Sequence, residues 1–202
     1  MSEKMTSNKI QSGWPWFGFF HPALPLVFWG PVAITCIAWG VASYSLDWST
    51  TAIIGSTALG VWTFIEYLMH RFLLHPPEHR KLLSRWAQLA HGVHHDAQDE
   101  PVHTMVPPVN AVLILMPFLA LFYCLVPEWA LAVFIGFFLA GYLGYEYIHY
   151  SFHQSDSKSH PKSRLGKAIR RHHLTHHAHG HAGNFGVTTP LWDYLLGTRL
   201  RS

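Results

Sequence analysis

Four stretches of this chain are apolar enough and long enough to cross a lipid bilayer as helices, and this feature constrains the fold more than any other. A helix needs about 20 apolar residues to span the hydrocarbon core. The four stretches cover residues 24–44, 52–70, 109–126 and 129–149. Only 12% of the residues are charged, whereas soluble domains carry about 25%. We therefore expect an all-α polytopic membrane protein with four transmembrane helices.

The core of a soluble helical bundle is the alternative explanation of four apolar helices. A helix in such a bundle shows a polar stripe with a period of 3.6 residues, and Leu131–Tyr145 shows none. The spans leave an N-terminal tail, residues 1–23, and two polar regions, residues 71–108 and 150–202. We interpret the whole chain, residues 1–202, as a single domain.

The basic residues decide the expected orientation of the spans. All fourteen Lys and Arg lie before the first span, between the second and third, or after the fourth, and the short connections at residues 45–51 and 126–128 carry none. Because cytoplasmic segments are enriched in Lys and Arg, we expect both termini and both polar regions in the cytoplasm. The polar regions would form a histidine-rich cap there, on a bacterial inner membrane or the endoplasmic reticulum.

Histidine is unusually frequent, with 17 residues, and ten of them fall in four short clusters. The clusters are His70 with His75, His91 with His94 and His95, His149 with His153, and His173 with His176 and His177. The expected topology brings all four clusters to one face of the membrane. Imidazole suits iron, copper, nickel or zinc better than magnesium or calcium. Ten ligands exceed what one ion accepts, so the clusters predict two metal ions.

The spacing within the clusters is typical of helices that present ligands. His149 and His153 are four residues apart and share one helix face, and the three histidines of each His-x-x-His-His motif can do the same. His70 and His75 are five residues apart, about 140° around an ideal helix. They either point to different metals or mark a distortion at the end of the helix.

The motifs HRFLLH (His70–His75), HGVHH (His91–His95), HYSFH (His149–His153) and HLTHH (His173–His177) resemble those of the membrane fatty acid hydroxylase and sterol desaturase superfamily. The tail Asn184–Thr198 resembles its fatty acid 2-hydroxylase branch. The resemblance implies that the ten clustered histidines bind two iron ions, or zinc in purified protein, with O2 as co-substrate. It implies hydroxylation of a lipid acyl chain, with carbon 2 of a fatty acyl or sphingolipid chain favoured. Desaturation, or oxidation of a sterol or carotenoid, is the alternative within the superfamily.

Carboxylates near the clusters are candidates for orienting the ligands, because a histidine that binds metal usually donates its other N–H to a carboxylate or carbonyl. Glu66 and Glu146 lie within or at the edge of spans, where an acid is costly and usually has a role or a partner. Each either orients a histidine or relays protons, or simply forms a salt bridge, as Glu66 could with Arg71. Asp96 and Asp99 could act similarly, with surface solvation as their plainer explanation.

Asn184, Trp192 and Asp193 resemble tail residues of the family, and docking of the tail under the metal site is their plainer explanation. The remaining histidines do not fit the motifs, and we expect most of them to be solvated, with His103 and His172 nearest the site. They are His21, His79, His103, His160, His172, His179 and His181.

Electrons must reach the predicted centre from outside the chain. The sequence has no Gly-x-Gly-x-x-Gly fingerprint and no cysteine cluster for an iron–sulfur centre, so we expect an NAD(P)H-linked ferredoxin, cytochrome or reductase as donor. The basic stretch Lys158–Arg171 could dock that donor or bind anionic lipid headgroups. The expected partners are this donor, a lipid acyl substrate and membrane lipids, and no nucleic acid. A membrane metal transporter is the non-enzyme alternative, although its histidines should lie near the bilayer midplane.

Overall fold

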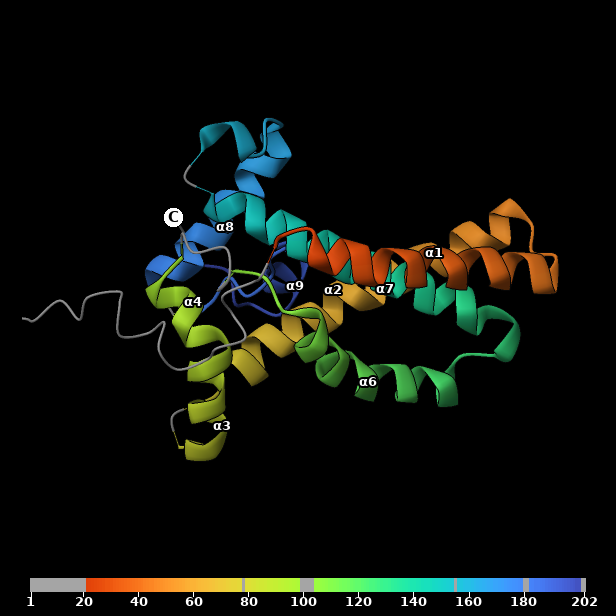
Figure 1. Ribbon diagram of the computed structural model, residues 1–202. Coiled ribbons are helices and arrows are strands. Elements are labelled where there is room, and N and C mark those ends of the chain that lie inside the picture. Colours follow the sequence, from red (N-terminus) through yellow and green to blue (C-terminus); the bar gives the residue numbers. More distant parts are fainter. Residues whose placement is uncertain (1–20, 78, 99–103, 155, 180–181, 201–202) are drawn as a thin grey trace, which may run out of the picture.

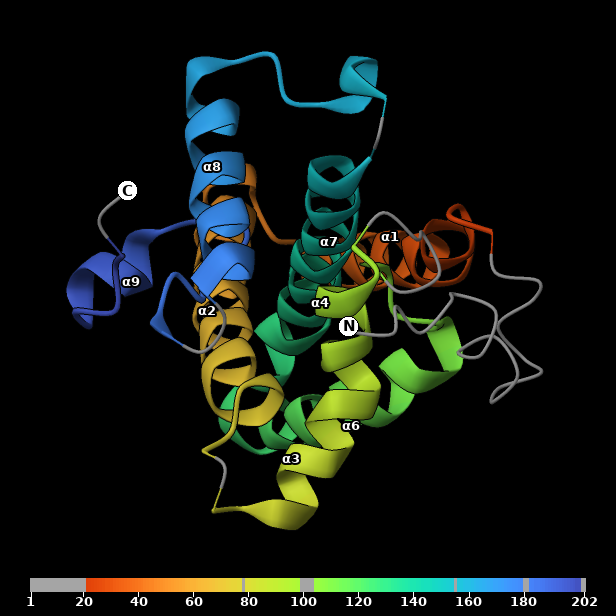
Figure 2. The same cartoon turned by 90° about the vertical axis from the view of Figure 1, so that its left-hand side faces the viewer.

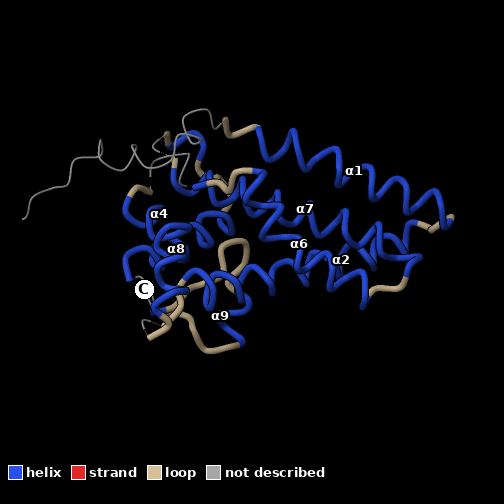
Figure 3. The backbone as a smooth tube through the Cα atoms, turned by 60° about the horizontal axis from the view of Figure 1, so that its bottom comes forward, coloured by secondary structure: helices blue, strands red, loops and turns tan. Residues whose placement is uncertain are grey.

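The computed structural model describes residues 21–77, 79–98, 104–154, 156–179 and 182–200. Every regular element in those residues is helical, as the sequence predicts (Figure 3). Four helices in this part of the chain are long and apolar enough to cross a membrane. They are α1 (Leu24–Tyr44), α2 (Trp48–Leu68), α6 (Pro108–Leu125) and α7 (Glu128–His153).

Local signals explain where these helices begin and end. Asp47 caps α2, because its Oδ1 accepts a hydrogen bond from the Thr50 amide at 2.7 Å. This cap starts the helix at Trp48, before the predicted span at residue 52. Helix α7 continues without interruption to His153, so both histidines of the third cluster lie on one rigid helix.

Helix α7 lies at the centre of the bundle and contacts α1, α2 and α6 (Figure 1). Gly136 of α7 allows α1 to approach closely, because a Cβ atom there would lie 2.7 Å from the carbonyl oxygen of Ala33 and 2.5 Å from Cγ1 of Ile37. Membrane helices commonly pack through such small residues. On the outside of the bundle, apolar side chains such as Val109 and Leu113 of α6 are exposed, as expected of a lipid-facing surface.

Shorter helices form a cap at the end of the bundle where α2 and α7 end and α6 begins (Figures 1 and 2). They are the π-helices η4 (Met69–Leu74) and η5 (Gln88–Gly92), the 3-10 helix η6 (Ser157–Ser159), and the α-helices α3 (Lys81–Ala87), α4 (Val93–Asp96), α8 (Arg164–His179) and α9 (Leu191–Leu195). Seen from the cap end, α8 runs roughly perpendicular to the bundle axis on the same side as α2 (Figure 2). Helix α9 lies at the edge of the molecule, beside α2 (Figure 2).

Candidate metal centre

The ten clustered histidines meet in the cap as two groups of five. Each histidine offers one ring nitrogen, and within each group these nitrogens all lie within 4.8 Å of one another. We call the groups site A and site B. Site A consists of His70, His75, His91, His95 and His176, and site B of His94, His149, His153, His173 and His177. Sets of imidazole nitrogens this close together suit transition-metal ions.

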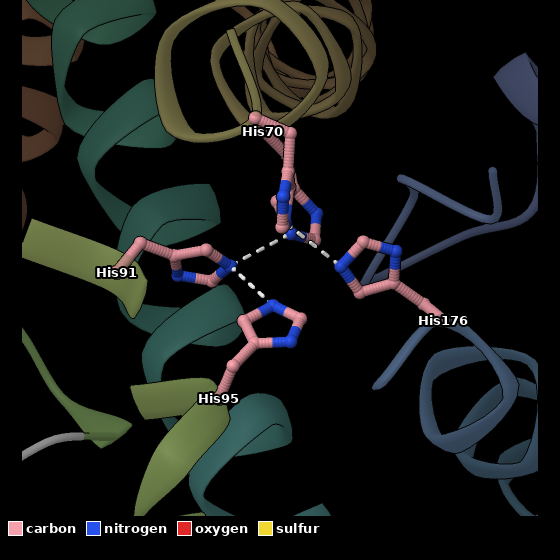
Figure 4. Close-up of side chains that lie close together, drawn as sticks. His70, His91, His95 and His176 are labelled. Atoms are coloured by element: carbon pink, nitrogen blue, oxygen red, sulfur yellow. Dashed lines mark hydrogen bonds between the residues drawn. The ribbon is translucent and has the colours of Figure 1, made fainter. Parts of the chain in front are cut away.

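Site A draws its side chains from η4, from η5 with α4, and from α8. Figure 4 shows the rings of four of its members directed toward a common centre. The π-helix η4 accounts for the five-residue spacing of His70 and His75, because the His75 amide donates to the His70 carbonyl at 3.1 Å. This i→i+5 bond widens the turn, so two histidines five residues apart return to the same side. Of the two explanations left open by the sequence, the distortion is the one observed.

Site B draws its side chains from α7, α8 and α4. His149 and His153 project from the same face of α7, one turn apart. The Nε2 atoms of His153 and His173 lie 2.8 Å apart, and those of His173 and His177 lie 3.0 Å apart. His94 completes the group, with its Nε2 3.2 Å from Nε2 of His177.

The partners of the Nδ1 atoms reveal which ring nitrogens carry lone pairs into the sites. A backbone carbonyl only accepts hydrogen bonds, so Nδ1 of His176, 2.8 Å from the Gly183 oxygen, carries the proton. The lone pair on Nε2 of the neutral ring then faces Nε2 of His75 at 3.0 Å. Likewise, Nδ1 of His149 donates to the Thr104 carbonyl, and its buried Nε2 has no hydrogen-bond partner among the described residues. Each group therefore directs at least one imidazole lone pair inward, among other ring nitrogens, and this arrangement fits a bound cation.

Burial keeps five of the clustered histidines of the cap in the neutral form, which is the form that binds metal. Burial, reinforced by neighbouring imidazoles, lowers the pKa of His91, His94, His173 and His177. Burial also lowers the pKa of His176 to about 4, although its hydrogen bond to Gly183 opposes the shift. The residues present therefore fit two transition-metal ions both in geometry and in protonation state.

A loop of the C-terminal tail orients site A through two carbonyl groups. The Phe185 oxygen accepts from Nδ1 of His70, and the Gly183 oxygen accepts from Nδ1 of His176. The loop thereby fixes the proton on Nδ1 of both rings and directs their Nε2 atoms into the site, as carbonyl partners of metal-binding histidines do.

Asp193 of α9 holds this loop in shape. Its Oδ1 accepts from the Phe185 amide and its Oδ2 from the Gly186 amide, both at 2.8 Å. His172 and Thr198 also donate to this buried carboxylate. Burial raises the pKa of Asp193, but the hydrogen bonds from the two side chains and the two amides outweigh burial and hold the pKa below its ordinary value.

Glu66 binds the same tail rather than a histidine. Its Oε1 accepts from the amides of Val187 and Thr188 at 2.7 and 2.9 Å, and its Oε2 accepts from the Thr188 hydroxyl at 2.6 Å. Arg71, which the sequence suggested as a salt-bridge partner of Glu66, instead donates to the Tyr67 hydroxyl at 2.7 Å. Through these bonds, Glu66 acts on site A by way of the tail loop.

Glu146 supports site B in a comparable way. Its Oε2 accepts from the Val106 amide at 3.0 Å. The segment that it holds also contains Thr104, whose carbonyl orients His149. A carboxylate one turn below a predicted ligand thus fixes the backbone that positions the ring.

Asn184 and Trp192 dock the tail, in agreement with their plainer explanation. The Asn184 side chain accepts from the Leu200 amide and donates to the His172 carbonyl. The Trp192 indole donates to the Thr63 hydroxyl of α2 at 3.1 Å. Asn184 joins the loop to α8 and to the residues that follow α9, whereas Trp192 joins α9 to a helix 129 positions earlier in the chain.

Most of the remaining predicted residues lie away from the two groups or outside the described residues. Asp96 is exposed at the end of α4, as surface solvation predicts. His172 is near the centre but bonds to Asp193. His79 and His179 are exposed. Asp99, His103 and His181 lie outside the described residues.

Sequence reasoning missed the carbonyl groups of Thr104, Gly183 and Phe185, because a backbone acceptor has no side-chain signature. The one available signal was glycine. A Cβ at Gly183 would lie 2.1 Å from the Thr198 carbonyl oxygen, so only glycine fits where the loop meets the end of the tail.

Comparison with known proteins agrees with this architecture. The family model described as "Fatty acid hydroxylase" matches residues 55–198, which include both sites. A dihydroceramide fatty acyl 2-hydroxylase of Arabidopsis thaliana is 32% identical over 183 residues, 87% of this chain and 72% of the plant protein. The fatty acid 2-hydroxylase of Mus musculus is 34% identical over 159 residues, 77% of this chain and 42% of the mouse protein. The chain thus spans less than half the length of the mouse relative.

A solved structure has the same fold. Full-length Scs7p, of which only the hydroxylase domain is visible, superposes with a TM-score of 0.80 at 26% sequence identity. The superposition covers 89% of this chain and 67% of the Scs7p chain, so the likeness extends over the spans and the cap together.

Proposed function

Because the chain belongs to the fatty acid hydroxylase family, we propose that it is a membrane oxygenase that uses O2 and two iron ions to hydroxylate a lipid acyl chain. Carbon 2 of a fatty acyl chain, free or in a ceramide-like lipid, is the proposed position, because the relatives are named as fatty acid and dihydroceramide fatty acyl 2-hydroxylases.

The observation that carries this proposal is the pair of five-histidine sites. Both are largely buried at the cap end of the bundle, and each directs at least one imidazole lone pair inward, from Nε2 of His176 in site A and from Nε2 of His149 in site B. Bound iron would supply the O2 activation that an aliphatic C–H bond requires and that no side chain provides. We assign the ten histidines as its ligands, five to each ion.

The other residues of the centre would act by positioning. The carbonyls of Phe185, Gly183 and Thr104 fix ring orientation and keep the proton on Nδ1. Asp193 and Glu66 hold the tail loop that carries two of these carbonyls. Rings fixed in advance are expected to raise metal affinity, since removing such partners commonly costs 10- to 100-fold.

The cap is proposed to lie in the cytoplasm, as the distribution of Lys and Arg supports. The centre would then sit where α2 and α7 leave the hydrocarbon, within reach of an acyl chain held in the membrane. Electrons would come from an external NAD(P)H-linked donor.

Two alternatives make different predictions. A metal transporter would have ligands along a path near the middle of the spans, whereas both groups of histidines lie at the cap end of the bundle. A desaturase, or a sterol or carotenoid oxidase, would share the metal centre but release a different product. The names of the relatives favour hydroxylation.

Metal analysis of detergent-purified protein tests the centre. We expect two iron or zinc ions per chain by mass spectrometry. The paired substitution His91→Ala with His176→Ala removes ligands only from site A, and His94→Ala with His173→Ala removes them only from site B. Each pair should lose one ion, while His79→Ala with His179→Ala, at exposed positions, should lose none. Equal metal content in all these proteins would refute the assignment.

Product analysis tests the reaction. Cells that express the protein under 18O2 should accumulate 2-hydroxylated acyl chains that carry the heavy oxygen, and cells with either paired site variant should not. A new double bond without added oxygen would identify a desaturase. Iron binding without any change in lipids would contradict the proposed substrate.

A further inference from the structure

Helix α9 presents an apolar face that no described part of the chain covers. Leu191, Tyr194, Leu195 and Leu196 are 48%, 57%, 65% and 48% exposed. On the opposite side of this helix, Asp193 is completely buried. A soluble protein rarely exposes so many large apolar side chains together, so this face calls for a partner.

Contacts with α2 set the depth of α9 along the bundle. The Trp192 indole donates to the Thr63 hydroxyl, and its ring lies 4.6 Å from the Phe64 ring, centroid to centroid. At a rise of 1.5 Å per residue, Thr63 is roughly 22 Å from Trp48, the exposed aromatic residue that begins α2. The hydrocarbon core is about 30 Å thick, and any tilt of α2 reduces the depth reached. Thr63 therefore lies inside the hydrocarbon if Trp48 marks the far interface.

Site A lies farther along the α2–η4 segment, toward the membrane surface, than the point where α9 contacts α2. His70 follows Thr63 by two turns on the same continuous helical segment, so it lies about 10 Å closer to the membrane surface. The exposed face of α9 is thus continuous with the lipid-facing surface of α2, where Phe64 is also exposed. Next to this face, the Arg199 guanidinium stacks over the Tyr194 ring at 4.5 Å. Such a pair suits the headgroup boundary, where a long basic side chain reaches toward water.

We propose that α9 is embedded in the leaflet next to the cap and that lipid acyl chains cover Leu191, Tyr194 and Leu195. The bilayer is then a structural partner of site A. Asp193 projects from the buried side of α9 to the Phe185 and Gly186 amides, and the Phe185 carbonyl orients His70. Insertion of α9 holds this chain of contacts in place, a role that goes beyond the proposed hydroxylation.

Site-directed spin labelling tests the depth of α9 without reference to metal or activity. With Cys36 and Cys124 replaced by Ala, a nitroxide is attached at Leu195→Cys in vesicles of phosphatidylcholine and phosphatidylglycerol. Leu113→Cys on α6, 73% exposed, is the lipid-facing control, and His79→Cys in the cap is the aqueous control. The label on α9 should be relaxed by oxygen as strongly as the α6 label and be protected from a water-soluble nickel complex. Nickel access equal to that of the His79→Cys label would overturn the proposal.

Hydrogen exchange tests the link from lipid to the tail loop. The double substitution Leu191→Ser with Leu195→Ser is compared with Leu82→Ser, which alters an equally apolar, 84% exposed residue on α3. In nanodiscs, the Phe185 and Gly186 amides should exchange several-fold faster in the α9 variant only. Unchanged exchange would show that lipid contact does not support the loop. Both readouts remain valid if the protein hydroxylates no lipid.

Discussion

The substitution Asp193→Asn removes a charge and exchanges one acceptor for a donor while keeping the shape of the side chain. Each carboxylate oxygen accepts from one backbone amide, Oδ1 from Phe185 and Oδ2 from Gly186. Whichever way the new amide group turns, its NH2 therefore faces a backbone N–H. No rotamer flip restores the pattern, and at least one buried amide loses its acceptor.

The expected cost follows from these contacts. A hydrogen bond to a charged group contributes about 1.5–3 kcal/mol, and an amide left unsatisfied adds its desolvation penalty. We expect a loss of about 2–4 kcal/mol in the free energy of unfolding. For a chain of this size each kcal/mol corresponds to a shift of about 2–4 °C in the midpoint, so the midpoint should fall by roughly 10 °C. Site A should also lose its metal more readily than site B, because the disturbed loop orients His70 and His176.

Thermal unfolding followed by circular dichroism and metal analysis of the same detergent-purified sample would measure both effects. Asp156→Asn is the matched control, because Asp156 is exposed and accepts from the Lys158 amide at 2.9 Å. It should shift the midpoint by no more than a few degrees and leave the metal content unchanged. If Asp193→Asn behaved like this control, the loop would not depend on the carboxylate and the argument for its role would fail.

Three further changes test other parts of the structure. Gly183→Ala brings a Cβ to 2.1 Å from the Thr198 carbonyl oxygen, so we expect lower thermal stability and loss of the site A ion, and normal metal content would contradict this. Gly136→Leu forces α1 away from α7 at Ala33 and should lower the free energy of unfolding by several kcal/mol. Denaturant unfolding in detergent would measure this loss, with Gly144→Leu as the control, because Gly144 has open space around it. Metal-free protein should lose stability as the pH falls from about 6.5 to about 4, because an unfolded imidazole takes up a proton in this range while His176 in the folded protein, with a pKa of about 4, does not. At pH 5.5 the free energy of unfolding should be lower by about 1.4 kcal/mol for each such histidine. A midpoint of thermal unfolding that is independent of pH would refute this expectation.

The features that the sequence predicts well are those encoded locally. Twenty-residue apolar segments and the polar turns between them identify the four long helices, and the short spacing of the histidines reveals each cluster. The way the ten histidines divide into two sites depends on contacts between residues about a hundred positions apart, such as His75 with His176. The roles of Glu66 and Asp193 were not accessible either, because both carboxylates act on backbone amides of the tail rather than on the rings.

The division of each His-x-x-His-His motif between the two sites follows from helix geometry. Successive residues turn by about 100°, so the first and last histidines of a motif lie about 40° apart, whereas the middle one diverges from the last by about 100°. In η5 and α4 the outer pair contributes to site A and His94 to site B, and in α8 the outer pair contributes to site B and His176 to site A. The motifs thus exchange one histidine each, and the rings of His95 and His177 stack at 4.2 Å between the two sites. Neither motif can move without disturbing both sites, so the spacing that identifies the centre in the sequence also joins its two halves into one unit.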